Sequence, residues 1–239
     1  MKTFLLALAL ALTPATLAAA QAAPVPFPEQ ESLSYSVNWP SGLNLGEAEA
    51  SATMLKGPDG TPTGWRFDFR IEASFPGYGI QDEFHSTATP ELCSREFEKR
   101  LHHGAKRAHE RTNFDQKRHV AKRMTLGGGG ETEIKTGACA MDGLSFLYHL
   151  RRELSRGRIP PPRTVLFGAP YQVSLQLADT TKVRLHGKTI EADRLTVSVK
   201  GPASEITFLV EVARDAARTP VRITVPLEPG SFTMELAEQ

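Results

Sequence analysis

The sequence predicts a mainly β protein: a curved antiparallel sheet, forming an open or partly closed barrel, with one central α-helix packed on its concave face. Three observations lead to this prediction. Apolar and polar residues alternate in many short segments, turn residues separate these segments, and one segment has helical periodicity. The length of 239 residues and the hydrophobic content of 40% allow a packed core and exclude a disordered chain.

The first 22 residues have the layout of a secretory signal peptide. Lys2 precedes a short apolar run over residues 4–12, and small residues from Ala18 to Ala23 offer cleavage sites. The run is too short to span a bilayer. We therefore expect residues 1–22 to be removed, and residues 23–239 to form one β-rich domain without a transmembrane segment, in the periplasm or secreted.

Export changes how the charges and cysteines are interpreted. The chain has 28 Lys+Arg and 27 Asp+Glu, so losing Lys2 leaves 27 of each. Nucleic acid is excluded as an expected partner, because export removes most such targets and few aromatic residues interleave the basic ones. Cys93 and Cys139 are the only cysteines, and an oxidising compartment favours a disulfide between them. The alternative is a reactive thiol, which would need a lowered pKa that nothing in the sequence indicates.

The strands follow a proline-rich lead over residues 23–28. The clearest is residues 65–71, where Trp65, Phe67 and Phe69 share one face and charged residues occupy the other. Such alternation is typical of half-buried antiparallel strands. Residues 33–39 and 47–54 are also predicted strands, and a pair of strands in the basic segment described below brings the total to about a dozen. The six later segments are 171–177, 182–186, 194–200, 206–212, 221–225 and 232–236.

One helix is predicted over residues 141–154. Asp142 is a suitable N-cap, and leucines recur at three- and four-residue steps from Leu144 to Leu154. Arg151 and Arg152 suit the negative end of the helix dipole. Gly157 and the prolines at 160–162 end the helix.

The most unusual composition lies between residues 95 and 123, which hold ten basic and four acidic residues. One interpretation is a surface for anionic partners; the other is a pair of solvated strands whose charges resist edge pairing. The candidate anion-binding residues are Lys99, Arg100, Lys106, Arg107 and Arg111.

Four histidines in the same segment suggest metal binding: His102, His103, His109 and His119. No H-E-x-x-H or C-x-x-C motif accompanies them, so no metal ligand set is nominated. The glycines at 127–130 lack the Lys-Ser/Thr of a phosphate loop and predict a hairpin connection. The sequence nominates no catalytic residue and no cofactor.

Several segments resemble the bacterial family called domain of unknown function 3108. The opening strand from Leu33 to Trp39 with Gly46-Glu47-Ala48, the helix segment 142–148 with Arg151 and Gly157, and the closing segment 218–223 occur in the family's order. The likeness covers residues 33–236. It implies an exported antiparallel β protein and brings no catalytic residues.

These observations favour a non-enzymatic periplasmic binding or carrier module for a lipid-like or other hydrophobic ligand. A half-barrel with a movable apolar helix could enclose an acyl chain. The candidate ligand-facing residues are Trp65, Phe67, Phe69, Phe146 and Leu147, which core packing would explain equally well. A second hypothesis is a cell-envelope assembly scaffold that binds a protein partner through a strand edge. A third is a metal-dependent hydrolase built on the four histidines.

Overall fold

The computed structural model describes residues 25–75, 77–185, 187–227 and 230–237. The predicted signal peptide, residues 1–22, lies outside these residues. Within the described ranges, no helix combines the length and the apolar character needed to cross a membrane.

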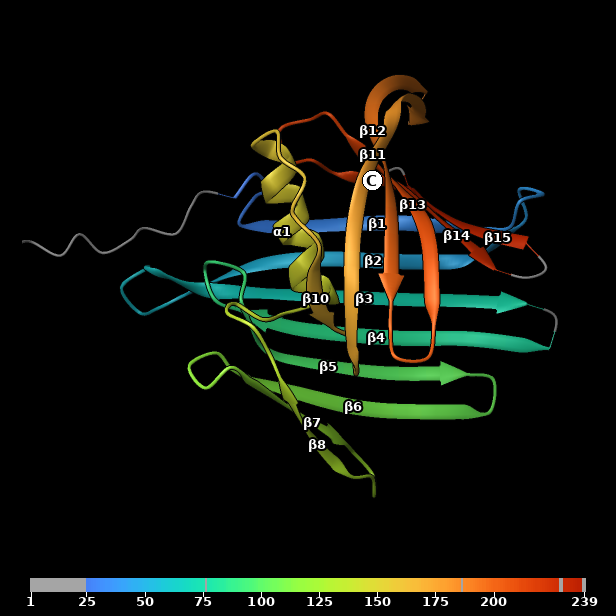
Figure 1. The fold of residues 1–239 in the computed structure, drawn as a ribbon. Helices are drawn as coiled ribbons and strands as arrows, with labels where there is room; N and C mark the ends of the chain where they lie inside the picture. Colours follow the sequence, from blue (N-terminus) through green and yellow to red (C-terminus); the bar gives the residue numbers. More distant parts are fainter. Residues whose placement is uncertain (1–24, 76, 186, 228–229, 238–239) are drawn as a thin grey trace, which may run out of the picture.

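All described strands belong to one sheet, in the order β8-β7-β6-β5-β4-β3-β2-β1-β15-β14-β13-β12-β11-β10-β9 (Figure 1). Neighbouring strands are antiparallel except β9 and β10, which are parallel. The first and last strands pair with each other, Tyr35 opposite Leu236, and so join the two halves of the sheet. The protein is mainly β, and its curved sheet is not closed into a barrel, as the sequence predicts. Its elements are β1 (Gln30–Asn38), β2 (Asn44–Lys56), β3 (Pro62–Phe75), β4 (Tyr78–Ala88), β5 (Ser94–His103), β6 (Lys106–Asp115), β7 (Val120–Thr125), β8 (Glu131–Lys135), β9 (Met141–Asp142), α1 (Gly143–Ser155), β10 (Arg163–Leu166), β11 (Pro170–Leu185), β12 (Lys188–Lys200), β13 (Glu205–Ala213), β14 (Pro220–Leu227) and β15 (Gly230–Leu236).

Alternation explains the inner and outer faces of the strands. In β3, Trp65 and Phe67 are 2% and 0% exposed, whereas Arg66 between them faces solvent. The predicted segments 171–177 and 182–186 are parts of a single strand, β11, whose register shifts between Leu177 and Asp179. Gly127 and Gly128 lie in the turn between the antiparallel strands β7 and β8, which confirms the predicted hairpin connection.

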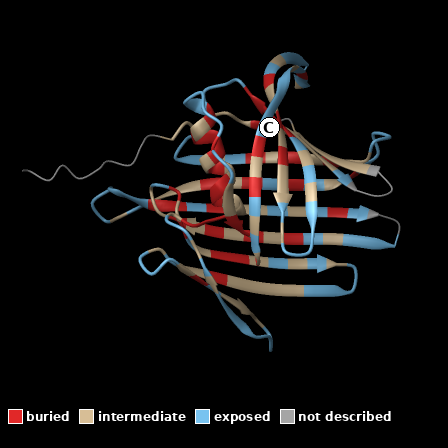
Figure 2. Ribbon diagram, viewed as in Figure 1, coloured by how far each residue is buried: buried red, intermediate tan, exposed pale blue. Residues whose placement is uncertain are grey.

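The second half of the sheet lies across the first, so that strands from β10 to β13 cross over strands of the set β1 to β5 (Figure 1). Phe167, in the turn after β10, holds the two layers together. Its ring centroid lies 5.2 Å from that of Phe84 on β4 and 5.3 Å from that of Phe97 on β5. Burial is concentrated on α1 and on the strand segments next to it (Figure 2).

The helix α1 lies between the layers and begins where the sequence predicts. Asp142 is its N-cap, and Gly157 with φ 70° lies just beyond its end. The Tyr148 ring stacks on Phe67 with centroids 4.2 Å apart, and Phe27 meets Tyr148 edge to face at 4.8 Å. Aromatic contacts therefore fix one face of α1 against β3, which leaves another face for the site described below.

Candidate functional site

An apolar cavity of about 510 Å³ lies between α1 and the inner faces of β10 to β14. Its volume falls in the range of small-molecule binding sites. None of the described residues that line it is charged, and the only side-chain polar atoms are the hydroxyls of Tyr171 and Ser204. The lining residues are Gly143, Phe146, Leu147, Leu150, Val165, Phe167, Tyr171, Val173, Leu175, Val197, Val199, Ser204, Ile206, Phe208, Val210 and Ile223.

Two periodicities build this lining. Gly143, Phe146, Leu147 and Leu150 follow a helical spacing and form one stripe of α1. The strand residues alternate along each strand, so that every second side chain enters the cavity. Val173 and Val210 at the base are buried, whereas Ser204, in the turn before β13, is exposed and marks the rim.

The N-terminus of α1 is held by a buried polar cluster. One oxygen of the Asp142 carboxylate accepts hydrogen bonds from Ser86 (2.6 Å), Ser94 (2.5 Å) and Ser145 (3.0 Å), and the other accepts from the Leu144 amide (2.8 Å). Burial raises the pKa of Asp142, and the hydrogen bonds from the serines counteract this only in part. The cluster is fully enclosed, so it serves to position the helix.

The C-terminal half of α1 is held by a buried ion pair. Arg151 donates to both Glu31 oxygens, at 2.6 and 2.7 Å, and its Nε donates to the Ala217 carbonyl at 3.1 Å. Its guanidinium also lies 5.0 Å from the ring centroids of both Phe27 and Tyr148. Arg152 lies in the last turn of α1, as the sequence predicts, and Arg151 lies one residue before that turn. Its partner is a carboxylate on β1, far away in the sequence.

A disulfide between Cys93 and Cys139 joins the segment before β5 to the segment before β9. The Gln116 side chain donates to the carbonyls of Ser94 (2.6 Å) and Ala140 (3.0 Å) and accepts from the Ala140 amide (3.0 Å). The chain that leads into α1 is thus bound to the first half of the sheet. Buried polar contacts hold both halves of α1 and oppose an outward movement of the helix from this position.

The five candidate ligand-facing residues separate into two groups. Phe146 and Leu147 line the cavity. Trp65 and Phe67 are buried in the core, stacked with centroids 6.0 Å apart, and Phe69 packs beside Phe84 at 5.9 Å. Sequence reasoning missed the residues of β11 to β13, although their alternating Val, Leu, Ile and Phe side chains were a signal for an inner face.

The five candidate anion-binding residues do not form one patch. Arg100 and Arg111 pair with Glu98 at 2.8 and 2.7 Å, and Lys99 pairs with Glu110 at 3.1 Å. Arg107 donates to backbone carbonyls at the hairpin turn. Lys106 opens β6, where it is exposed.

Glu98 is the centre of this ion-pair network. Burial acts to raise the pKa of Glu98, but hydrogen bonds from Arg111 and His109, with the charges of Arg111 and Arg100, lower it to about 2. Ion pairs between neighbouring strands therefore neutralise part of the positive charge of β5 and β6.

The four histidines of the metal hypothesis are not brought together. His103 contacts Asp82 at 2.8 Å and His109 contacts Glu98 at 2.8 Å, whereas His102 lies opposite Arg107 and His119 lies in the turn before β7. Across the described ranges, no three His, Cys, Asp or Glu side chains converge in a group that could hold a metal ion.

Comparison with known proteins places this architecture in a family. The profile of the family described as "Protein of unknown function (DUF3108)" matches residues 34–237. The chain belongs to the DUF3108 family. This membership confirms the resemblance found in the sequence. No curated protein sequence matches the chain.

Solved structures show that the DUF3108 fold is shared more widely. The chain is similar to a β-barrel-like protein of the domain of unknown function DUF1849 from Brucella abortus, with a TM-score of 0.59 and 9% identity, over 87% of this chain and 95% of that one. A candidate lipoprotein from Parabacteroides distasonis aligns over 91% of this chain and 99% of that one, with 9% identity and a TM-score of 0.33. The first of these likenesses supports the fold.

Proposed function

We propose that this protein is a non-enzymatic binding or carrier module, outside the cytoplasm, for a ligand with an apolar chain. The observation that carries the proposal is the cavity of about 510 Å³ between α1 and β10 to β14. A site that binds a polar substrate needs charged or hydrogen-bonding groups inside it. This cavity offers hydrocarbon walls and two hydroxyls, at Tyr171 and Ser204, which suits an acyl chain, and no histidine, carboxylate, lysine or cysteine lies among its described lining residues.

The disulfide supports a location outside the cytoplasm. Disulfides persist in the periplasm and in secreted proteins, and cytoplasmic thiols are kept reduced. The bond between Cys93 and Cys139 lies next to Ser94 and Ala140, so it reinforces the segment that leads into α1. Together with the signal-peptide pattern of residues 1–22, it favours an exported carrier.

The experiment is a chain-length series. Saturated fatty acids of increasing length are titrated into the purified protein, and native mass spectrometry measures the bound fraction. Each buried CH₂ contributes roughly 0.8 kcal/mol, which corresponds to about a fourfold gain in affinity per added methylene until the cavity is full. Affinity that does not depend on chain length would overturn the proposal.

A pair of matched variants tests where the chain binds. Val199 lines the cavity, whereas Thr207, on the neighbouring strand, is exposed on the outer face. Val199→Phe adds an aromatic ring inside the cavity and shortens the longest chain that binds. Thr207→Phe makes the same kind of replacement outside and leaves the series unchanged. Equal effects of the two variants would place the ligand elsewhere.

The scaffold hypothesis finds less support at the exposed strand edge. Three of the five residues of β8, Glu131, Glu133 and Lys135, are charged and exposed. Charged side chains on an edge strand disfavour pairing with another chain. A partner protein remains an outcome that a pull-down from envelope extracts would identify.

A further inference from the structure

We propose that the protein also binds a phosphate group in a second, cationic pocket between α1, β10 and the segment after β8. This pocket has a volume of about 270 Å³, and its basic lining residues are Lys135, His149 and Arg163. It is separate from the apolar cavity. Val165 of β10 lines the apolar cavity, whereas its neighbours Thr164 and Leu166 line the cationic pocket. The inference therefore does not depend on the proposed function.

The main observation is positive charge without a counterion. Arg163 donates one hydrogen bond, from Nη2 to the Cys139 carbonyl at 2.7 Å, and its buried Nε has no acceptor. Arg152 on α1 is 8% exposed, and its Nε also has no acceptor. Within the described part of the chain, neither guanidinium has a carboxylate within ion-pair distance, although buried Arg151 next to Arg152 is fully paired with Glu31.

Such an arrangement is costly unless an anion completes it. The Arg163 side chain is half-buried, and its buried Nε is a donor that has lost its hydration without gaining a hydrogen bond, which destabilises the fold. Of the four buried side-chain polar atoms that lack a partner among the described residues, two belong to Arg152 and Arg163. Of these two, Arg163 lines the pocket, so an anion there would give its Nε an acceptor and offset its charge.

His149 contacts Arg152 and lines the pocket together with Arg163. Arg152 Nη2 lies 3.0 Å from His149 Nδ1. Because a guanidinium can only donate, Nδ1 is the acceptor and the neutral ring carries its proton on Nε2. Burial, followed by the charges of Arg152 and Arg163, lowers the pKa of His149 to about 4, with Arg156 acting in the same direction and Glu153 against it. At neutral pH the pocket therefore offers the uncharged N–H of His149 beside the charges of Arg163 and Lys135.

The charge balance favours phosphate over a carboxylate. Two cationic side chains line the pocket, the Arg163 guanidinium without a counterion and the Lys135 ammonium, and together they match a dianion better than a single negative charge. Arginine and lysine are the residues that most often bind phosphate oxygens. The group could belong to free phosphate or to a lipid headgroup, and the two sources are separated by experiment.

The test uses isothermal titration calorimetry with inorganic phosphate at pH 7, with sodium chloride of equal ionic strength as the control. NMR then follows the His149 ring during a pH titration. Bound phosphate offsets the arginine charges, so we expect the pKa of His149 to rise by at least one unit. If phosphate gives no heat of binding and raises the pKa of His149 no more than sodium chloride does, binding of phosphatidylglycerol vesicles is measured next. Vesicle binding without phosphate binding assigns the pocket to a headgroup, and failure of both probes overturns it.

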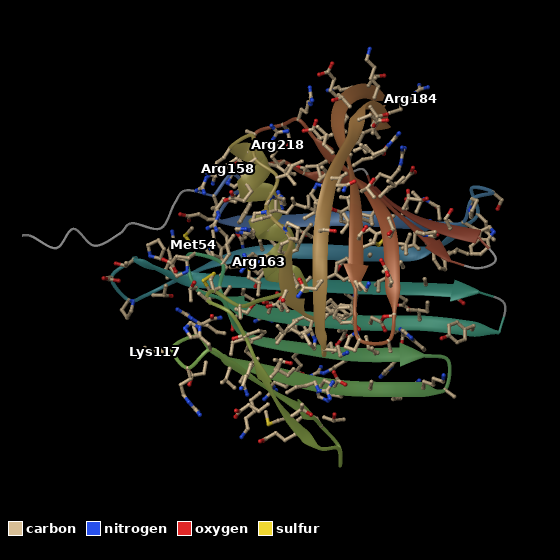
Figure 3. All side chains as sticks on the ribbon, in the orientation of Figure 1. Met54, Lys117, Arg158, Arg163, Arg184 and Arg218 are labelled. Atoms are coloured by element: carbon tan, nitrogen blue, oxygen red, sulfur yellow. A yellow bond between two sulfur atoms is a disulfide. The ribbon has the colours of Figure 1, made fainter. Side chains whose placement is uncertain are left out.

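Three variants locate the binding. Arg163→Gln removes the partnerless guanidinium and is expected to weaken binding at least tenfold. Lys135→Gln changes an exposed lysine at the same pocket, is not expected to affect folding, and should weaken binding severalfold. Lys117→Gln makes the same change on an exposed lysine outside the pocket (Figure 3) and should leave binding unchanged. Wild-type affinity in Lys135→Gln and Arg163→Gln would refute the site.

Discussion

The ion pair between Arg151 and Glu31 gives the sharpest prediction about stability. The two side chains are 1% and 8% exposed, and Glu31→Gln removes the charge that compensates a buried guanidinium. Loss of one partner of a buried pair costs about 3–5 kcal/mol. The Ala217 carbonyl and the rings of Phe27 and Tyr148 still surround Arg151, so we expect the lower end, about 3 kcal/mol. For a chain of this size that corresponds to a fall in Tm of roughly 6–12 °C.

The measurement is urea unfolding of the oxidised protein, with a matched control in the same segment. Glu29 also pairs with a cation, Lys56, at 2.6 Å, but its side chain is 62% exposed. Exposed pairs contribute at most about 1 kcal/mol, so Glu29→Gln should have little effect. The double variant of Glu31→Gln with Arg151→Met should be more stable than the sum of the single variants implies, since it leaves no buried charge. If Glu31→Gln costs no more than Glu29→Gln, the role given to this pair is wrong.

Two further predictions concern acid and reduction. Because the pKa of Glu98 is lowered from 4.5 to about 2, its contribution to stability is complete above about pH 4.5 and is lost as the pH falls toward 2. Glu98→Gln should therefore lower the free energy of unfolding by about 1–3 kcal/mol at pH 7 and reduce the further loss of stability between pH 4.5 and 2. Urea unfolding at several pH values measures this, and a loss between pH 4.5 and 2 as large as in the wild type would contradict it. Replacing both Cys93 and Cys139 by serine opens a loop with a sequence separation of 46 and should lower the free energy of unfolding by about 4 kcal/mol. A loss below about 1 kcal/mol in the same assay would contradict this prediction.

Local signals in the sequence predicted local structure well. Asp142 as N-cap and the helix that follows it were predicted from capping and spacing, and the structure has both. The alternation of Trp65, Phe67 and Phe69 predicted the inner face of β3 in the same way. These features depend on neighbours within a few residues, and their physical causes are visible in the sequence itself.

The candidate sites could be predicted only in part, because they depend on contacts between distant segments. Alternation shows that Phe67 and Val199 both face inward, but only the crossing of the two layers decides that Phe67 packs against Tyr148 while Val199 borders a cavity. Likewise, no spacing rule pairs Arg151 with Glu31, since the two are 120 positions apart. The charge of a residue is evident from sequence, and its partner is set by topology.

The contacts that hold α1 bear on how a ligand of the proposed function would reach the apolar cavity. To swing the helix outward, the protein would have to separate Arg151 from Glu31 and open the Asp142 cluster. Both sets of contacts would have to break together, and they therefore oppose an outward movement of the helix. The rim formed by Ser204, with the half-buried Ile206 and Phe208 beside it, needs no comparable loss. On the proposed function, we therefore expect an apolar chain to enter beside the turn between β12 and β13.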